Sequence, residues 1–228
     1  MILVKPSFKI LEIMVSDYQD NPLPLGSLKL IEFAGRTCYK SVNKITQDSA
    51  EKFVKRIIES GHESVLEHSA MTVKFICDRG VSHELVRHRL CSFSQESTRY
   101  CNYSGGVTFV IPPWITIPEG IYTERRFDCT WSDNPYEDGN ISWMFSLYDA
   151  EGSYIDLLAQ GWSPQQARSV LPNSLKTEIV VTANFREWKH IFKLRTSKAA
   201  HPQMREIMIP LLEECKKLIP VIFDNIKY

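Results

Sequence analysis

Apolar and polar residues alternate over several short stretches of the chain, and this period of two predicts β-strands. Residues 2–14 form the first strand region, which Pro6 interrupts. Met71, Val73 and Phe75 alternate with polar neighbours and predict a second strand. Two more strands are predicted over residues 106–112 and 177–183.

Other stretches repeat their apolar residues every three or four positions, which is the period of a helix. They predict helices over residues 27–39, 46–60, 140–160 and about 202–219. The second of these helices carries one apolar stripe, formed by Ala50, Phe53, Val54, Ile57 and Ile58. Gly61 follows it as a typical C-terminal stop.

Three further helix starts carry capping signals. Ser82 is predicted to cap a helix that runs into Arg87-His88-Arg89. Ser163-Pro164-Gln165-Gln166 combines a capping serine, a proline at the first helical position and a capping-box glutamine. Asn184-Phe185-Arg186-Glu187 is a second start of the capping-box kind, and its helix is predicted to end near Arg195.

The remaining stretches are predicted to connect these elements. Residues 91–105 are expected to be loop, and residues 116–139, rich in Pro, Gly, Asp and Glu, a surface excursion. No internal repeat, low-complexity tract or linker divides the sequence. We therefore expect a single α+β domain over residues 1–228, with a central, mostly antiparallel sheet flanked by helices.

Composition narrows the class of protein. The chain has 228 residues, of which 43% are hydrophobic and 24% charged, which argues against disorder. Its net charge of zero counts against general nucleic-acid binding. No apolar run approaches the ~20 residues needed to cross a bilayer. The N-terminal residues lack the features of a signal peptide, and none of the six cysteines forms a Cys-x-x-Cys pair, so we expect a cytoplasmic protein with free thiols.

The strongest candidate for chemistry is Arg87-His88-Arg89, followed after seven residues by Ser97-Thr98-Arg99. Crowded cations repel one another, so an anion that receives them is expected nearby. Arginine side chains match phosphate oxygens two at a time, and a serine hydroxyl adds a donor. The segment therefore predicts a phosphate or nucleotide site. The plainer interpretation is a solvated basic loop paired with Glu84 and Glu96.

A second candidate, Gly61 to His68, brings two histidines and two carboxylates close together in the sequence. Metal ligation is the less favoured interpretation, because the spacing is not His-Glu-x-x-His and no cysteine pair supports it. We therefore predict no metal site.

These segments resemble those of one enzyme family, the flavin-dependent thymidylate synthases. The resemblance rests on Gly61-His62-Glu63, on the Arg-His-Arg motif with Ser97 and Arg99, on Ala167-Arg168 before Leu171-Pro172, and on Asn184. It covers residues of about 61–105 and 167–201, and the spacing is preserved within each block.

The resemblance implies which residues contact each ligand. For deoxyuridine monophosphate (dUMP) these are Glu84, Leu85, Val86, Arg87, Gln95, Glu96, Ser97, Thr98, Arg99, Arg168 and Arg195. For FAD they are His62, Ser64, Arg87, His88, Arg89, Gln95, Asn184, Phe185, Arg186 and His190. Arg195 is implied as the catalytic residue, which presses on the uracil ring and favours ionisation at its imide nitrogen.

The resemblance also implies the reaction and its partners. It is a reductive methylation of dUMP to thymidylate, with methylenetetrahydrofolate as carbon donor, FAD as hydride carrier and NADPH as reductant. The cofactor carries the redox chemistry, while the protein positions and polarises the substrate. The resemblance further implies a homotetramer with sites shared between subunits, and we expect neither a nucleic-acid nor a membrane partner.

Three alternatives stay open at this point. The first is a flavin enzyme that acts on a different pyrimidine or forms a different one-carbon product. The second is a nucleic-acid-binding module with a basic and aromatic surface, formed by Arg87, His88, Arg89, Phe93, Tyr100 and Tyr103. The third is a phosphate-binding domain without catalysis.

Overall fold

The computed structural model describes residues 1–14, 25–123 and 138–228. Its α-helices are α1 (Leu25–Cys38), α2 (Ser49–Glu59), α3 (Arg79–Leu85), α4 (Gly139–Ala159), α5 (Pro164–Ala167), α6 (Phe185–Arg195), α7 (Pro202–Leu218) and α8 (Pro220–Phe223). Three 3₁₀ turns are η1 (Val42–Lys44), η2 (Glu63–His68) and η3 (Arg168–Val170). The strands are β1 (Ile2–Val4), β2 (Ser7–Ile13), β3 (Ala70–Asp78), β4 (Cys91–Gln95), β5 (Thr108–Val110), β6 (Gly120–Ile121) and β7 (Lys176–Asn184).

In the described residues these strands form two sheets. The larger has the order β2-β3-β7-β4, and the smaller the order β5-β1-β6. β3 and β7 run antiparallel, because Thr72 bonds Thr182 while Arg79, directly after β3, bonds Leu175, directly before β7. β1 is parallel to β5 and antiparallel to β6. The expected α+β class, with an antiparallel sheet flanked by helices, is confirmed.

The described residues form two compact units, each assembled from separate stretches of chain. Unit 1 comprises Met1–Ser7, Ile76–Leu85 and Gln95–Ile179. Unit 2 comprises Phe8–Phe75, Val86–Ser94 and Val180–Tyr228. The expectation of a single domain over the whole chain stays a prediction.

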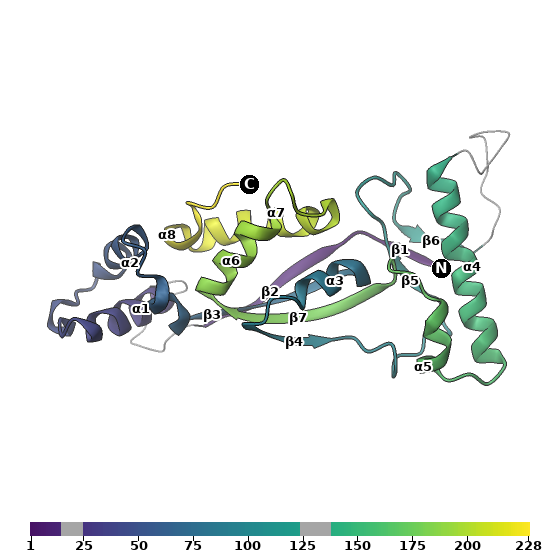
Figure 1. Cartoon of the computed structure of the whole chain (residues 1–228), viewed down its shortest axis with the longest axis horizontal. Coiled ribbons are helices and arrows are strands. Elements are labelled where there is room, and N and C mark those ends of the chain that lie inside the picture. The colour runs from purple at the N-terminus through teal and green to yellow at the C-terminus, as the bar shows by residue number, and fades with distance from the viewer. Residues whose placement is uncertain (15–24, 124–137) are drawn as a thin grey trace. The chain divides into compact units, whose positions relative to one another are not determined.

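Unit 1 has its core between the small sheet and α4. Leu3 of β1 and Phe109 of β5 are buried with Met144 and Tyr154 of α4, and α4 lies alongside these strands (Figure 1). Glu151, in the middle of α4, accepts a hydrogen bond from the Val107 amide at 2.7 Å. A buried carboxylate needs such donors, so this contact ties the helix to the start of β5.

Unit 2 is largely helical, and aromatic side chains fill its core. Trp188 of α6 is fully buried, and its indole N–H donates to the backbone oxygen of Met71 in β3 at 2.9 Å. Phe192 meets the Phe223 ring edge-to-face at 5.6 Å. α6 is therefore anchored on both the sheet and α8, which leaves little freedom for the side chains on its other face.

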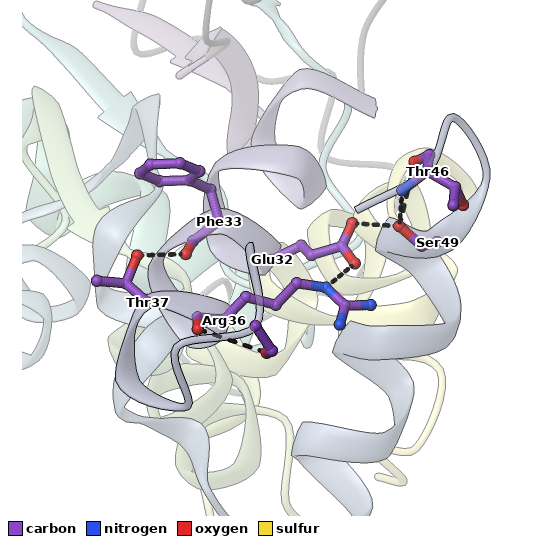
Figure 2. Close-up of polar contacts among 7 residues, drawn as sticks. Glu32, Phe33, Arg36, Thr37, Thr46 and Ser49 are labelled. Carbon is purple, nitrogen blue, oxygen red and sulfur yellow. Dashed lines mark hydrogen bonds and ion pairs between the residues drawn. The ribbon is translucent and has the colours of Figure 1, made fainter. Parts of the chain in front are cut away.

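A buried polar network joins α1 to α2 in unit 2. Glu32 has no exposed surface, and its two carboxylate oxygens accept from Arg36 Nε at 2.6 Å and from Ser49 Oγ at 2.8 Å (Figure 2). Gly35 lets the two helices approach, since a Cβ there would lie 2.6 Å from the Phe53 ring. A carboxylate buried in this way is stable only because both oxygens are bonded.

Most local signals in the sequence are confirmed. α2 ends in a Schellman motif: Gly61 has a φ of +72°, and the His62 amide donates back to Ile57. Ser163 and Gln166 form the expected capping box of α5. Asn184 caps α6, because its side chain accepts from the Glu187 amide at 2.8 Å.

Two local predictions are wrong. Ser82 does not cap a helix: α3 begins at Arg79, and the Asp78 carboxylate accepts from the Val81 amide at 2.6 Å. Ser82 instead lies inside the helix, where its hydroxyl bonds the Arg79 carbonyl. Residues 91–105 are not all loop, because residues 91–95 pair with the larger sheet as β4. Backbone pairing with its neighbour β7 stabilises β4 at the edge of the sheet, despite its polar sequence.

Part of the predicted surface excursion over 116–139, including Cys129, lies outside the described residues. Within the part of the chain that the structure describes, the cysteines Cys38, Cys77, Cys91, Cys101 and Cys215 are free thiols. None of the described helices is long and apolar enough to span a bilayer.

Candidate functional site

The Arg-His-Arg motif lies in the turn between α3 and β4. Arg87 and Arg89 expose their side chains, while His88 between them is only 5% exposed. The turn therefore points two cations outward and one imidazole into unit 2.

The buried His88 ring is held by α6. Its Nε2 accepts a hydrogen bond from Arg195 Nε at 3.0 Å, and its Nδ1 lies 3.5 Å from a carboxylate oxygen of Glu187. The His190 ring meets it edge-on, with ring centroids 5.9 Å apart. A single helix thus supplies every one of these partners. Because 187, 191 and 195 are spaced by one helical turn each, Glu187 and Arg195 share one face of α6.

The charge state of His88 follows from these surroundings. Burial, together with the positive charge of Arg195 and the neighbouring His190, lowers the pKa of His88 to about 4. The imidazole is therefore neutral at pH 7. Because Nε2 must be unprotonated to accept from Arg195, the contact assigns the proton to Nδ1, on the side of Glu187.

His88, Glu187 and His190 are also a group whose ligand atoms lie within 4.8 Å of one another, which is compatible with a metal ion. The Arg195 N–H already occupies the Nε2 lone pair of His88, and a guanidinium beside the group opposes a second cation. We therefore interpret these three residues, among those that the structure describes, as a cluster of protein side chains in contact with one another.

The Gly-His-Glu segment is fixed to α6 by two ion pairs. Lys189, only 1% exposed, bonds the Glu63 carboxylate, and Arg186 bonds Glu67 at 2.5 Å on the surface. His62 is exposed at the start of η2, with its Nδ1 3.4 Å from the Tyr39 hydroxyl. Ser64 in the same turn is exposed as well. The structure therefore brings the predicted flavin residues His62, Ser64 and Arg186 onto neighbouring elements of unit 2.

In unit 1 the second half of the motif meets Arg168. Arg168 Nη1 donates to the Thr98 hydroxyl at 2.9 Å, although the two residues are 70 positions apart. The Ser97 hydroxyl accepts from the Arg99 amide at 3.3 Å, and the exposed Arg99 guanidinium lies over the Tyr100 ring. The Ser97–Arg99 turn and η3 together thus present two exposed cations and a serine hydroxyl, which is a donor set suited to a phosphate monoester.

Glu96 and Gln95 turn toward internal partners. Glu96 accepts from the Tyr103 hydroxyl at 2.7 Å and from Lys176 at 3.0 Å. Burial and this hydrogen bond to Glu96 raise the pKa of Tyr103, so it remains protonated. The Gln95 amide donates to Ser82 at 2.9 Å and to Thr177 at 3.2 Å. Both side chains therefore fix the two residues that directly precede the Ser97–Arg99 turn.

Other predicted residues are also placed by the structure. Leu85 and Phe185 have their side chains in the core, so they can offer a ligand only backbone groups. Asn184 uses its side-chain oxygen to cap α6. Glu84 is half-buried, whereas Val86 and His190 are exposed.

Sequence reasoning assigned no site role to three residues that hold these clusters together, Glu187, Lys189 and Lys176, and it considered Tyr103 only for a nucleic-acid surface. Glu187 stands at the third helical position, where the sequence predicts a capping-box partner. In the structure its carboxylate faces His88. The sequence did hold one indication of this role: Asn184 can cap the helix by itself, so the Glu187 carboxylate is not required for the cap.

Comparisons with known proteins show the family to which the chain belongs. Residues 24–221 match the family model described as thymidylate synthase complementing protein. Flavin-dependent thymidylate synthases from Corynebacterium efficiens and Pyrococcus furiosus are 35% and 33% identical to the chain, over 88% and 91% of its length and 80% of theirs. The chain therefore belongs to the flavin-dependent thymidylate synthase family.

A solved structure shares the fold. The UMP/dUMP methylase PolB from Streptomyces cacaoi, bound with 5-Br dUMP, superposes with a TM-score of 0.75 at 23% identity. The match covers 98% of this chain and 96% of that one.

Proposed function

We propose that this chain methylates dUMP reductively to thymidylate, with methylenetetrahydrofolate as carbon donor, a flavin as hydride carrier and NADPH as reductant. The observation that carries the proposal is the contact that places Arg168 beside the Ser97-Thr98-Arg99 turn, because the resemblance of these segments implies one nucleotide site. Their donors suit the phosphate of a mononucleotide.

The residues present fit a dinucleotide flavin. Arg87, Arg89 and Arg186 expose guanidinium groups in unit 2, and the chemistry of these donors matches a pyrophosphate. His62 lies exposed on the turn that Lys189 and Arg186 fix to α6. A bound flavin would supply the hydride chemistry, which no side chain can supply.

The protein's own part is electrostatic and positional. Ser97, Arg99 and Arg168 bind the phosphate of dUMP and so fix the orientation of the nucleotide. Arg195 places its positive charge against the uracil ring, where it favours ionisation of the imide nitrogen and makes the ring carbon more enolate-like. Ser97 serves as a binding hydroxyl, because the structure gives its oxygen an amide donor and shows no base bonded to it within the described residues.

A homotetramer with sites shared between subunits is part of the proposal. Val86 and Leu90 flank the Arg-His-Arg motif and expose apolar surface, with Leu90 73% exposed. Such residues beside a site fit a surface that another copy of the chain covers. Light scattering on the purified protein should then give four times the 26.3 kDa of one chain.

The test is the mass of the product after the protein is incubated with dUMP, methylenetetrahydrofolate, FAD and NADPH. Thymidylate that forms only when all four are present supports the proposal. A parallel reaction with UMP asks whether the ribonucleotide is methylated as well, since PolB is described as a UMP/dUMP methylase. NADPH oxidation without a methylated nucleotide would contradict the assignment of dUMP as the acceptor.

A further inference from the structure

We propose that Glu187 and His88 are positioning residues for Arg195: the Glu187 carboxylate orients the His88 ring, and the ring nitrogen Nε2 holds the Arg195 guanidinium in its working orientation. This inference deepens the proposed function and rests on it, because it takes Arg195 as the group that polarises the substrate ring. Neither Glu187 nor the contact between His88 and Arg195 could be assigned from the sequence.

The contacts from Glu187 to His88 and from His88 to Arg195 are held rigid because the side chains of Glu187 and His88 are buried. The side chains of His88 and Glu187 are 4% and 10% exposed, and Trp188 and Phe192 anchor the helix that carries Glu187 and Arg195. A long arginine side chain at a helix end samples many rotamers, and ordering it costs free energy. A hydrogen bond from Nε to a rigid, buried acceptor removes this freedom before the substrate arrives.

The chemistry of the acceptor matters as well as its position. A neutral imidazole accepts the Arg195 hydrogen bond without cancelling the guanidinium charge, whereas a carboxylate in the same place would neutralise it. The Glu187 carboxylate faces the other ring nitrogen of His88, Nδ1. The carboxylate thereby fixes the tautomer in which Nε2 is the acceptor, as a second partner commonly does for a functional histidine.

The helix itself does not need the Glu187 carboxylate for its cap. Asn184 already accepts the amide hydrogen bond of Glu187, and the Glu187 side chain points to His88 instead of returning to the cap. The other titratable groups that face this cluster are His190 on α6 and Cys91 on β4. Burial and the Glu187 charge raise the pKa of Cys91 to about 12, so it stays a neutral thiol beside the carboxylate.

The test compares Glu187→Ala and Glu187→Gln with the wild type in the full-length holoenzyme. We expect Glu187→Ala to lower kcat for thymidylate formation about tenfold, with less than a threefold change in the dUMP dissociation constant. Glu187→Gln keeps an acceptor for Nδ1–H and should recover much of the loss. Glu51→Ala is the matched control, because Glu51 is an exposed first-turn glutamate of α2, and it should leave kcat unchanged.

Two readouts do not depend on turnover. The ¹⁵N resonances of the His88 ring should show a protonated Nδ1 and an unprotonated Nε2 in the wild type, and a mixture of tautomers in Glu187→Ala. The absorbance of bound 5-fluoro-dUMP, followed against pH, should show its imide ionising at lower pH on the wild type than on Glu187→Ala.

The outcomes separate the two proposals. If Glu187→Ala retains the wild-type tautomer, absorbance profile and kcat, the positioning role is wrong. If kcat falls only in step with lost dUMP binding or a lower melting temperature, Glu187 is structural and the inference fails. A wild-type protein that forms no thymidylate would contradict the proposed function, whereas the tautomer of His88 would still decide whether Glu187 orients the ring.

Discussion

The two units of the chain hold their functional arginines in opposite ways. In unit 2, Arg195 is half-buried and donates to a histidine that is itself buried and faces a carboxylate. In unit 1, Arg99 and Arg168 are exposed, and the contacts that place them are the Tyr100 ring and the Thr98 hydroxyl. The first arrangement fixes a charge in a low-dielectric setting, and the second leaves cations at the surface.

This contrast in burial indicates which role suits each arginine. A fixed charge near buried surface acts strongly on a neighbouring ring and costs no reorganisation during the reaction. Exposed cations are screened by solvent, yet they can capture a free anion. Mutations in the buried cluster of His88, Glu187 and Arg195 should therefore have large effects on turnover and stability. Mutations at the exposed Thr98–Arg168 contact should have smaller effects, mostly on substrate binding.

The largest effect is expected at Arg195. Arg195→Ala removes the charge from the substrate ring, and we expect kcat for thymidylate formation to fall by about 10²–10³ or more, as it does when a preorganised electrostatic group is lost. The measurement is single-turnover formation of thymidylate. Arg195→Lys keeps a positive charge but loses the Nε contact with His88. Its kcat should therefore lie between those of the wild type and Arg195→Ala. Full activity in purified Arg195→Ala would show that the assignment is wrong.

The next effect concerns stability within unit 2. Lys189→Met leaves the Glu63 carboxylate without its buried partner, which should cost about 3 kcal/mol in the free energy of unfolding. The double variant Lys189→Met/Glu63→Gln should recover much of this loss. Arg186→Gln breaks the exposed pair with Glu67 and should cost less than ~1 kcal/mol. Urea denaturation measures all three, and equal losses for both lysine and arginine variants would refute the role of burial.

A third test uses pH. The folded-state pKa of His88 is about 4, below its ordinary value of 6.5, so the unfolded chain binds more protons between these values. Stability contributed by neutral His88 is therefore complete above pH 6.5 and is lost as the pH falls toward 4, by about 3 kcal/mol in all. His88→Gln keeps an acceptor and does not titrate, so its unfolding free energy should vary less over this range. Identical pH curves for the two proteins would contradict the prediction.

The smallest effect is expected at the exposed contact. Arg168→Ala should weaken dUMP binding roughly tenfold, about 1.4 kcal/mol, while kcat at saturating dUMP changes less. Isothermal titration with dUMP gives the affinity, and Lys52→Ala on α2 serves as a control for the loss of one exposed cation. A loss confined to kcat would reverse the contrast between the two units.

Local signals account for how much could be predicted. The Gly61 stop, the Ser163 capping box and the Asn184 cap depend on neighbouring residues only, and all three are confirmed. The errors arose where a distant partner decided the outcome. β4 is a strand because β7 offers it hydrogen bonds, and the Glu187 carboxylate faces His88 although its sequence position suits a cap.

The periodic elements, their caps, and the motif residues that place the chain in its family could be read from the sequence alone, because residue type and short spacing set them. The bond of Arg195 to His88, 107 positions away, and the bond of Arg168 to Thr98 became known from the folded chain. Such pairs form when packed elements bring distant side chains together, and their burial then sets charge and tautomer. Neither distance nor dielectric environment is written in the local order of residues.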